Sequence, residues 1–126
     1  MYKIKILKIG GSVFTYKDRD SELNTSVVIN IFQEIKKWLS EKSLNERMVF
    51  TSGAGSFGHP LAYKYQLNAP TSEKDNIGFV STTTNMQTMG SLIAKLAHEE
   101  SIPLLPIPPT SVFLTNNGRI INCASD

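Results

Sequence analysis

Two short glycine-rich stretches hold the residues of this 126-residue chain that are best suited to chemistry. The first is KIGGS at positions 8–12, and the second is TSGAGSFGHP at positions 51–60. Because glycine has no side chain to keep a ligand away, successive backbone N–H groups in such turns can approach a phosphate, above all at a helix N-terminus. The pair of stretches predicts a phosphate-binding site, although each one alone is also compatible with a purely structural turn.

Three side chains beside these stretches could act on a phosphate. His59 lies near the end of the second stretch, directly after its last glycine, where an imidazole can donate a hydrogen bond to a phosphate oxygen or to an anionic transition state. Lys8 ends a predicted strand, and we expect that strand to bury it in part. Cations at such positions stabilise the charge that develops in phosphoryl transfer. Lys17, in the polar run YKDRD, is expected at the surface when judged from its neighbours alone.

The other histidine and the single cysteine show no motif. His98 lies in a helical pattern and is expected at the surface. One cysteine, Cys123, allows no intramolecular disulfide and excludes a multi-cysteine metal site within one chain, which favours a reducing cytoplasm. We therefore expect no metal site built from the residues of this chain.

Two strands and one helix are predicted in the first half of the chain. Residues 3–9 alternate lysine with isoleucine and leucine and run into the first glycine pair. Residues 47–51 (RMVFT) form a second short strand that leads into the second glycine stretch. Between them a helix begins at an N-cap, Thr25 or Ser26, and ends near Lys42. Its apolar residues recur at helical spacing: Val28, Ile31, Phe32, Ile35, Trp38 and Leu39.

The second half of the chain continues the alternation. We expect a short helix at 61–67, a polar loop at 68–76 and a long helix at 77–100, followed by a buried strand at 103–107 (PLLPI). The run VFLTNNGRII predicts a hairpin with an Asn-Gly turn. Strands alternating with helices indicate an α/β sandwich with a largely parallel sheet, which binds ligands at the carboxyl ends of its strands. Both glycine stretches occupy such ends.

Composition places the chain among ordinary globular domains. Hydrophobic residues make up 40% and charged residues 19%, so one compact domain without disorder is expected. The 13 basic and 11 acidic residues form no run that would suggest nucleic acid. No apolar stretch approaches the ~20 residues that span a bilayer, and the N-terminus lacks a signal-peptide pattern. We expect a soluble, cytoplasmic protein.

The ordered set of motifs resembles the amino acid kinase superfamily and, within it, the isopentenyl phosphate kinases. LKIGGSVFTYK at 7–17 and MVFTSGAGSFGHPLAYKY at 48–65 carry the resemblance, and GFVSTTTNM, IPLLPIPPTS and NGRI follow in the same order. It implies a three-layer α/β sandwich with a mainly parallel central sheet. Residues 1–126 would be the N-terminal, acceptor-binding portion of that fold, without the ATP-binding C-terminal portion.

The resemblance also implies a reaction and roles for individual residues. Such kinases use ATP and Mg²⁺ to phosphorylate isopentenyl phosphate to isopentenyl diphosphate. By position, Lys8 would lie near the transferring phosphate, Lys17 would stabilise the transition state and His59 would hold the phosphate of the acceptor. The nucleotide phosphates would contact Lys8, Gly10, Gly11, Ser12 and Gly55. The acceptor would contact Gly53, Ala54, Gly58 and His59, with its isoprenoid tail near Phe79 and Met86.

Departures from the family pattern leave other functions open. Ser52 replaces the histidine that usually precedes the glycines, and Tyr16 replaces an aspartate before Lys17. Both features resemble fosfomycin kinase, a relative that phosphorylates a small phosphonate. A non-catalytic phosphate-binding fragment, inactive alone, is a third possibility. In each case the partner is a small phosphorylated molecule rather than nucleic acid or membrane, and the resemblance implies a homodimer.

Overall fold

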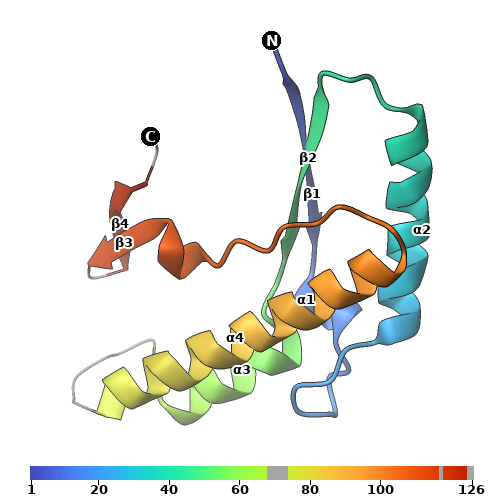
Figure 1. Cartoon of the computed structure of the whole chain (residues 1–126). Helices are drawn as coiled ribbons and strands as arrows, with labels where there is room; N and C mark the ends of the chain where they lie inside the picture. The colour runs from blue at the N-terminus through green and yellow to red at the C-terminus, as the bar shows by residue number, and fades with distance from the viewer. Residues whose placement is uncertain (68–73, 117, 125–126) are drawn as a thin grey trace.

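The computed structural model describes residues 1–67, 74–116 and 118–124 of the chain. Two strands, β1 (Lys3–Ile9) and β2 (Glu46–Ser52), form the parallel pair predicted from the sequence (Figure 1). In their register Lys8 lies opposite Thr51 and Ile9 opposite Ser52. Both strands therefore end at the same edge, and each one leads into a glycine stretch.

The helix α2 (Thr25–Glu41) connects the two strands, as expected for a parallel crossover. Its N-cap is Asn24, whose side chain accepts a 3.5 Å hydrogen bond from Val27 N. The prediction of Thr25 or Ser26 as the cap is wrong by one or two positions, because the Asn24 carboxamide takes this role. Ser26 Oγ instead donates to Asn24 Oδ1 at 3.0 Å.

Each glycine stretch forms the start of a helix. Gly11 begins the single-turn helix α1 (Gly11–Phe14), and Gly55 begins α3 (Gly55–Lys64). The helix expected at 61–67 thus starts earlier and includes Pro60. The bare GAGSFG segment is therefore the N-terminus of a helix, where backbone N–H groups are free to bind anions.

The long helix is confirmed as α4 (Lys74–Glu99), which starts three residues before the predicted position. Within the loop expected at 68–76, residues 68–73 lie outside the described residues. The run STTT is helical despite its weak propensity, because α4 packs along α3 and also contacts α2. Its buried stripe consists of Met89, Ile93 and Ala97.

No strand forms at 103–107, so this part of the prediction is wrong. Pro103 and Pro106 lack the N–H that a strand needs, and no described strand lies beside them to pair. A 3₁₀ turn, η1 (Pro109–Ser111), leads instead into the predicted hairpin of β3 (Phe113–Asn116) and β4 (Arg119–Cys123). Gly118 of the turn has φ +72°, whereas Asn117 lies outside the described residues.

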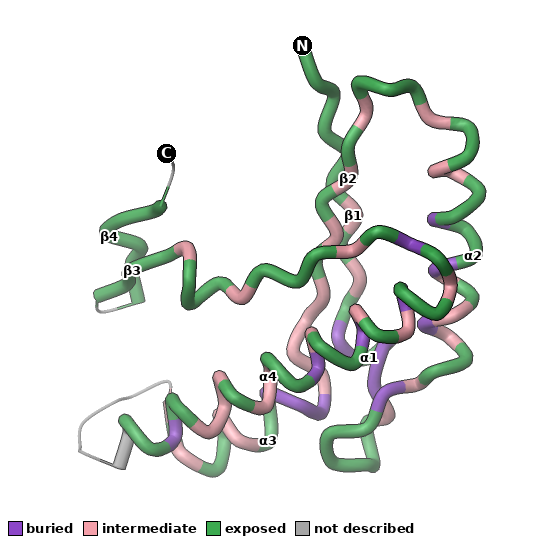
Figure 2. Tube along the Cα trace, viewed as in Figure 1, coloured by how far each residue is buried: buried purple, intermediate pink, exposed green. Residues whose placement is uncertain are grey.

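The core lies on one face of the parallel pair. Leu7, Ile9, Met48 and Phe50 pack against buried residues of α1, α2, α3 and α4. Figure 2 shows the buried segments gathered around α1 and along the inner sides of α2 and α4, whereas the hairpin is exposed. On the opposite face the side chains of Ile4, Ile6 and Val49 are 64%, 74% and 47% exposed. Among the described residues, no helix is long and apolar enough to cross a membrane.

Candidate functional site

The two glycine stretches touch each other backbone to backbone at the carboxyl ends of β1 and β2. A Cβ added to Gly11 would lie 2.7 Å from Gly55 Cα, and one added to Gly53 would lie 2.6 Å from Gly11 N. Gly55 has φ +51°, a conformation that favours glycine. Only glycine fits these positions, so the two turns are packed into a single unit.

One buried hydroxyl joins the two turns. Thr15 is 3% exposed; its Oγ1 donates to the Gly11 carbonyl at 2.9 Å and accepts from Ser56 N at 2.9 Å. This pair of bonds fixes the first turn of α3 against the end of α1. Thr15 was not among the predicted site residues. Its position as a hydroxyl residue shortly after the first glycine stretch is the feature of the sequence that could have pointed to it.

The N-terminus of α3 presents two backbone donors. Gly53 N donates to the Ile9 carbonyl at 3.0 Å and Ser56 N is bonded to Thr15, so neither is free in this structure. For Ala54 N and Gly55 N we find no acceptor among the described residues. These two N–H groups lie at the positive end of the helix dipole, which suits an anion such as phosphate.

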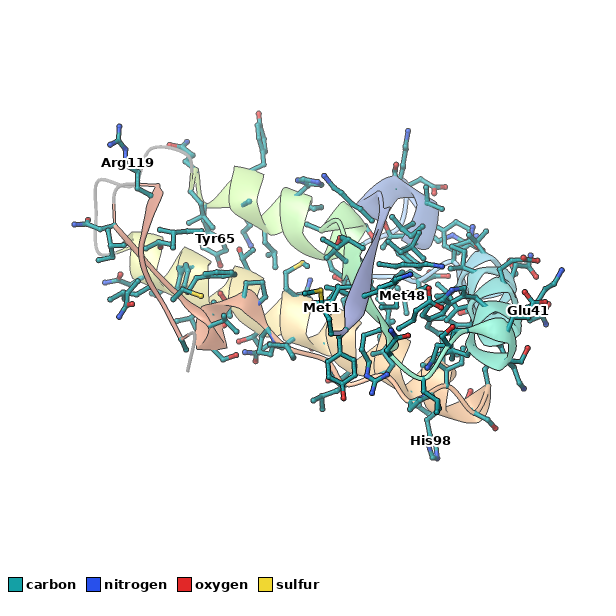
Figure 3. All side chains as sticks on the ribbon, turned by 90° about the horizontal axis from the view of Figure 1, so that it is seen from above. Met1, Glu41, Met48, Tyr65, His98 and Arg119 are labelled. Atoms are coloured by element: carbon teal, nitrogen blue, oxygen red, sulfur yellow. The ribbon has the colours of Figure 1, made fainter. Side chains whose placement is uncertain are left out.

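The three candidate side chains, Lys8, Lys17 and His59, are all exposed on elements that start or end at this edge. Lys8 is the second-to-last residue of β1, Lys17 lies in the loop after α1, and His59 lies in the second turn of α3. The expectation that Lys8 is partly buried is wrong, because alternation along the strand turns it away from the core that Leu7 and Ile9 face. His98, by contrast, points away from the body of the molecule, as predicted (Figure 3).

The remaining predicted positions differ in their surroundings. Gly10 has open space where a Cβ would be, and Ser12 is exposed. Gly58 is buried where α4 approaches α3, and a Cβ there would lie 3.0 Å from the sulfur of Met86. Phe79 is 55% exposed and lies seven residues from Met86, about 10.5 Å along α4. Neither residue lines the cleft described below.

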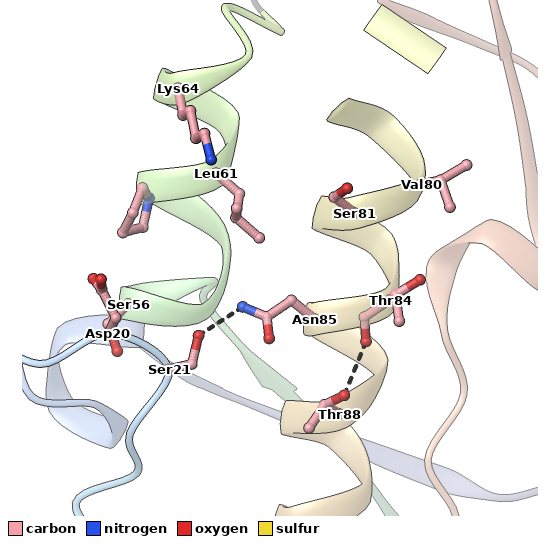
Figure 4. Close-up of a pocket in the computed structure, with 11 residues that line it drawn as sticks. Asp20, Ser21, Ser56, Leu61, Lys64, Val80, Ser81, Thr84, Asn85 and Thr88 are labelled. Carbon is pink, nitrogen blue, oxygen red and sulfur yellow. Dashed lines mark hydrogen bonds between the residues drawn. The ribbon is translucent and has the colours of Figure 1, made fainter. Parts of the chain in front are cut away.

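A cleft of about 620 Å³ opens between α3, α4 and the loop before α2 (Figure 4). None of the predicted site residues lines it. It is lined mostly by hydroxyl, amide and charged side chains, with a few apolar ones: Asp20, Ser21, Ser56, Pro60, Leu61, Lys64, Val80, Ser81, Thr84, Asn85 and Thr88. Ser56 and Pro60 are the residues that this cleft shares with the second glycine stretch. Ser21 and Asn85 were not among the predicted site residues, because nothing in their local sequence pattern indicates a functional role.

The site fits phosphate oxygens better than it fits a metal ion. Open space above Gly10, two donors at the start of α3 and the nearby Lys8 offer N–H groups and positive charge. Among the residues that the structure describes, no three His, Cys, Asp or Glu side chains gather to hold a metal ion. The arrangement can therefore orient phosphates and stabilise charge on them.

Comparison with known proteins identifies the family of this chain. Residues 3–124 match the model of the amino acid kinase family. This chain belongs to that family. The match covers both glycine stretches, α4 and the hairpin, in agreement with the motif order seen in the sequence.

Two of the relatives found in the comparison are named isopentenyl phosphate kinase. The chain is 28% identical over 120 residues to an isopentenyl phosphate kinase of Methanothermobacter thermautotrophicus, covering 91% of this chain and 44% of the relative. It is 30% identical over 129 residues to the isopentenyl phosphate kinase of Methanocaldococcus jannaschii, covering 97% and 49%. The chain thus spans about half the length of these relatives.

Solved structures agree with the fold. An X-ray structure of isopentenyl phosphate kinase superimposes with a TM-score of 0.84 at 27% identity, covering 96% of this chain and 50% of that one. A substrate complex of isopentenyl phosphate kinase gives 0.72 at 28% identity, covering 94% and 47%. The predicted amino acid kinase fold is confirmed for the half that the chain covers.

Proposed function

We propose that this chain is the acceptor-binding half of a kinase that transfers the γ-phosphoryl group of ATP to isopentenyl phosphate. The observation that carries the proposal is the backbone contact between Gly11 and the Gly53–Gly55 segment. This contact brings the two glycine turns together at one strand edge, which supports a site where a phosphate donor and a phosphate acceptor meet in line. The isopentenyl phosphate kinases that resemble the chain support this choice of acceptor.

The three cations take separate roles in this proposal. Lys8, at the carboxyl end of β1, faces the phosphate in transfer, and Lys17 stabilises the charge on its equatorial oxygens. His59, one turn into α3, donates a hydrogen bond to the phosphate of the acceptor. Transfer then forms a bond between an acceptor phosphate oxygen and the γ-phosphorus of ATP. The bond between the γ-phosphorus and the bridging oxygen breaks, and ADP leaves with that oxygen. Protein groups need only position the reactants and balance charge.

The nucleotide phosphates would contact Gly10, Gly11, Ser12, Gly55 and Lys8. Mg²⁺, when bound with ATP, would neutralise charge on these phosphates. We place the acceptor's phosphate at Gly53, Ala54 and Gly58 beside His59. Gly53 acts there through its small size, because its N–H is already bonded to Ile9.

The tail of the acceptor would lie along the face of α4 that holds Phe79 and Met86. Met86 packs against Gly58, so this face begins directly beside the second glycine stretch. An apolar tail is better suited to this face than the compact polar body of a phosphonate. The relatives compared above likewise favour isopentenyl phosphate over the fosfomycin-type acceptor.

We further propose that turnover requires an ATP-binding portion like the one in the other half of the relatives, and that the protein acts as a cytoplasmic homodimer. Exposed apolar side chains on the open sheet face, such as Ile6, support contact with further protein surface. Light scattering on the protein expressed from its complete reading frame tests the dimer, and a monomer at micromolar concentration would contradict it.

The function is tested by phosphorus NMR of a mixture of that protein, ATP, Mg²⁺ and isopentenyl phosphate. We expect isopentenyl diphosphate to form, and His59→Ala to lower kcat/KM about 100-fold. The matched control is His98→Ala, which alters the exposed histidine of α4 and is expected to match the wild type. Equal turnover by His59→Ala would refute the role of His59. Calorimetric binding of isopentenyl phosphate without turnover would support a phosphate-binding module instead.

A further inference from the structure

We infer that Asn85 is a positioning residue, which fixes the loop that carries Lys17 against the helix that carries His59. Asn85 is half-buried on α4, and its Nδ2 donates to Ser21 Oγ at 2.7 Å (Figure 4). The same Nδ2 also donates to the Phe57 carbonyl at 2.7 Å. One side-chain amide thus joins the loop at 16–22, α3 and α4. The consequence for turnover rests on the proposed function, whereas the contacts themselves do not.

Ser21 is held in a conformation that it would rarely adopt alone. Its φ of 54° lies in the left-handed region, which is uncommon for a residue with a side chain. Besides the bond from Asn85, its backbone N donates to the Ser56 carbonyl at 3.4 Å. Two contacts, one to α4 and one to α3, therefore keep this end of the loop in place.

Pro60 explains why the Ser56 carbonyl is available. In a regular helix this carbonyl would accept a hydrogen bond from the N–H four residues later. That residue is Pro60, which has no N–H, so the carbonyl remains open to Ser21. The proline of the SFGHP segment thus creates an acceptor on α3 at the place where the loop docks.

The loop is ordered internally, so a shift at Ser21 would move it as a unit. At its base Thr15 and Leu23 form a β-bridge, and Tyr16 N donates to the Glu22 carbonyl at 3.2 Å. On its outer side Arg19 pairs with Glu22 at 2.7 Å. Lys17 follows the base directly, and its backbone position therefore depends on how the loop is seated against α3 and α4.

A direct contact of Asn85 with substrate is the alternative, because Asn85 also lines the 620 Å³ cleft. Ser21 lines this cleft too, so the two roles differ in the kinetic parameter that changes. If Asn85 acts through the loop, removing either the Ser21 hydroxyl or the Asn85 amide lowers kcat and leaves KM nearly unchanged. If Asn85 binds substrate, Asn85→Ala raises KM.

The test uses Asn85→Ala, Ser21→Ala and the double variant in the protein expressed from its complete reading frame. We expect each single variant to lower kcat roughly 10- to 100-fold with KM for isopentenyl phosphate nearly unchanged, because Lys17 would act in the transition state. The double variant should be no worse than either single one. Thr88→Ala is the control on the same face of α4, since its hydroxyl bonds only to Thr84 of its own helix among the described residues.

A second readout needs no turnover. Trypsin cleavage after Lys17 and Arg19 should be roughly 3- to 10-fold faster in both single variants, because the loop opens more often. Cleavage after Arg119 of the hairpin serves as the internal control. Unchanged cleavage together with unchanged kcat would overturn the inference, as would a KM effect confined to Asn85→Ala. If the wild type does not phosphorylate isopentenyl phosphate, the proposed function fails while the cleavage rates still decide whether Asn85 holds the loop.

Discussion

The hydroxyl of Thr15 and the backbone N–H of Ser56 are joined by a 2.9 Å hydrogen bond, although 41 residues separate them. The same hydroxyl donates to the Gly11 carbonyl at 2.9 Å. Through this one group, the start of α3 is fixed to α1 where the two glycine stretches meet. The geometry of the candidate site therefore depends on a residue that touches no phosphate in the proposed reaction.

Replacing Thr15 with valine keeps its shape but removes both bonds. We expect Thr15→Val to lower the free energy of unfolding by about 1–3 kcal/mol, because the Ser56 N–H loses its acceptor. The Gly11 carbonyl loses one of two donors and keeps the bond from the Thr15 backbone N–H. Urea denaturation measures the change. Thr51→Val, at an exposed position of β2, is the control, and Thr15→Ser should restore most of the stability. Wild-type stability in Thr15→Val would show that the bond is not needed.

Adjacent glycines of the first stretch should respond differently to alanine. A Cβ on Gly11 would lie 2.9 Å from Gly53 C, whereas a Cβ on Gly10 meets nothing within 4 Å. We expect Gly11→Ala to cost roughly 1–3 kcal/mol of unfolding free energy through overpacking, and Gly10→Ala to change it little. Thermal unfolding of both variants gives the comparison. Equal melting temperatures would mean that the two stretches do not touch.

Lys17→Met tests the proposed role of the loop lysine. The substitution keeps an unbranched side chain and removes the charge, so we expect kcat to fall by roughly 100- to 1000-fold with folding intact. Lys37→Met, on the exposed side of α2, is the matched control. Steady-state kinetics with isopentenyl phosphate measure both. A kcat within twofold of the wild type would remove Lys17 from the reaction.

Glu46 should make stability depend on acid pH. The Ser43 N–H donates to this carboxylate at 3.0 Å, and this bond, helped by the charges of Lys5 and Lys3, lowers the pKa of Glu46 below its ordinary 4.5. A lowered pKa in the folded state stabilises the fold above the unfolded value and loses that effect as pH falls through the folded value. Stability should therefore decline below about pH 4.5.

The variant Glu46→Gln isolates this contribution. The urea denaturation midpoint of this variant should fall less between pH 6 and pH 3 than that of the wild type, since glutamine does not titrate. Glu34→Gln, at an exposed position of α2, should leave the decline as it is in the wild type. If Glu46→Gln and wild-type midpoints fall in parallel, Glu46 does not contribute to the dependence.

Much of the fold follows from local sequence patterns. The alternation in β1, the helical spacing in α2 and the turn before Arg119 each identify an element from neighbouring residues, and the structure confirms all three. The glycine stretches were likewise recognisable, because only glycine combines a bare backbone with free φ. Proline-rich 103–107 misled the prediction, since its apolar residues resemble a strand but its prolines cannot donate to one.

The contacts that hold the candidate site together became visible only when the helices and strands were packed against one another. Three contacts join residues that lie 41 to 64 positions apart in the sequence. They are the contact of Gly11 with Gly55, the bond from Ser56 N to Thr15 and the bond from Asn85 to Ser21. No local period encodes such pairings, because they arise when helices pack and buried polar groups must find partners. Local sequence patterns predicted which residues could bind phosphate. Packing determined which backbone donors stay free to do so and which side chains hold them there.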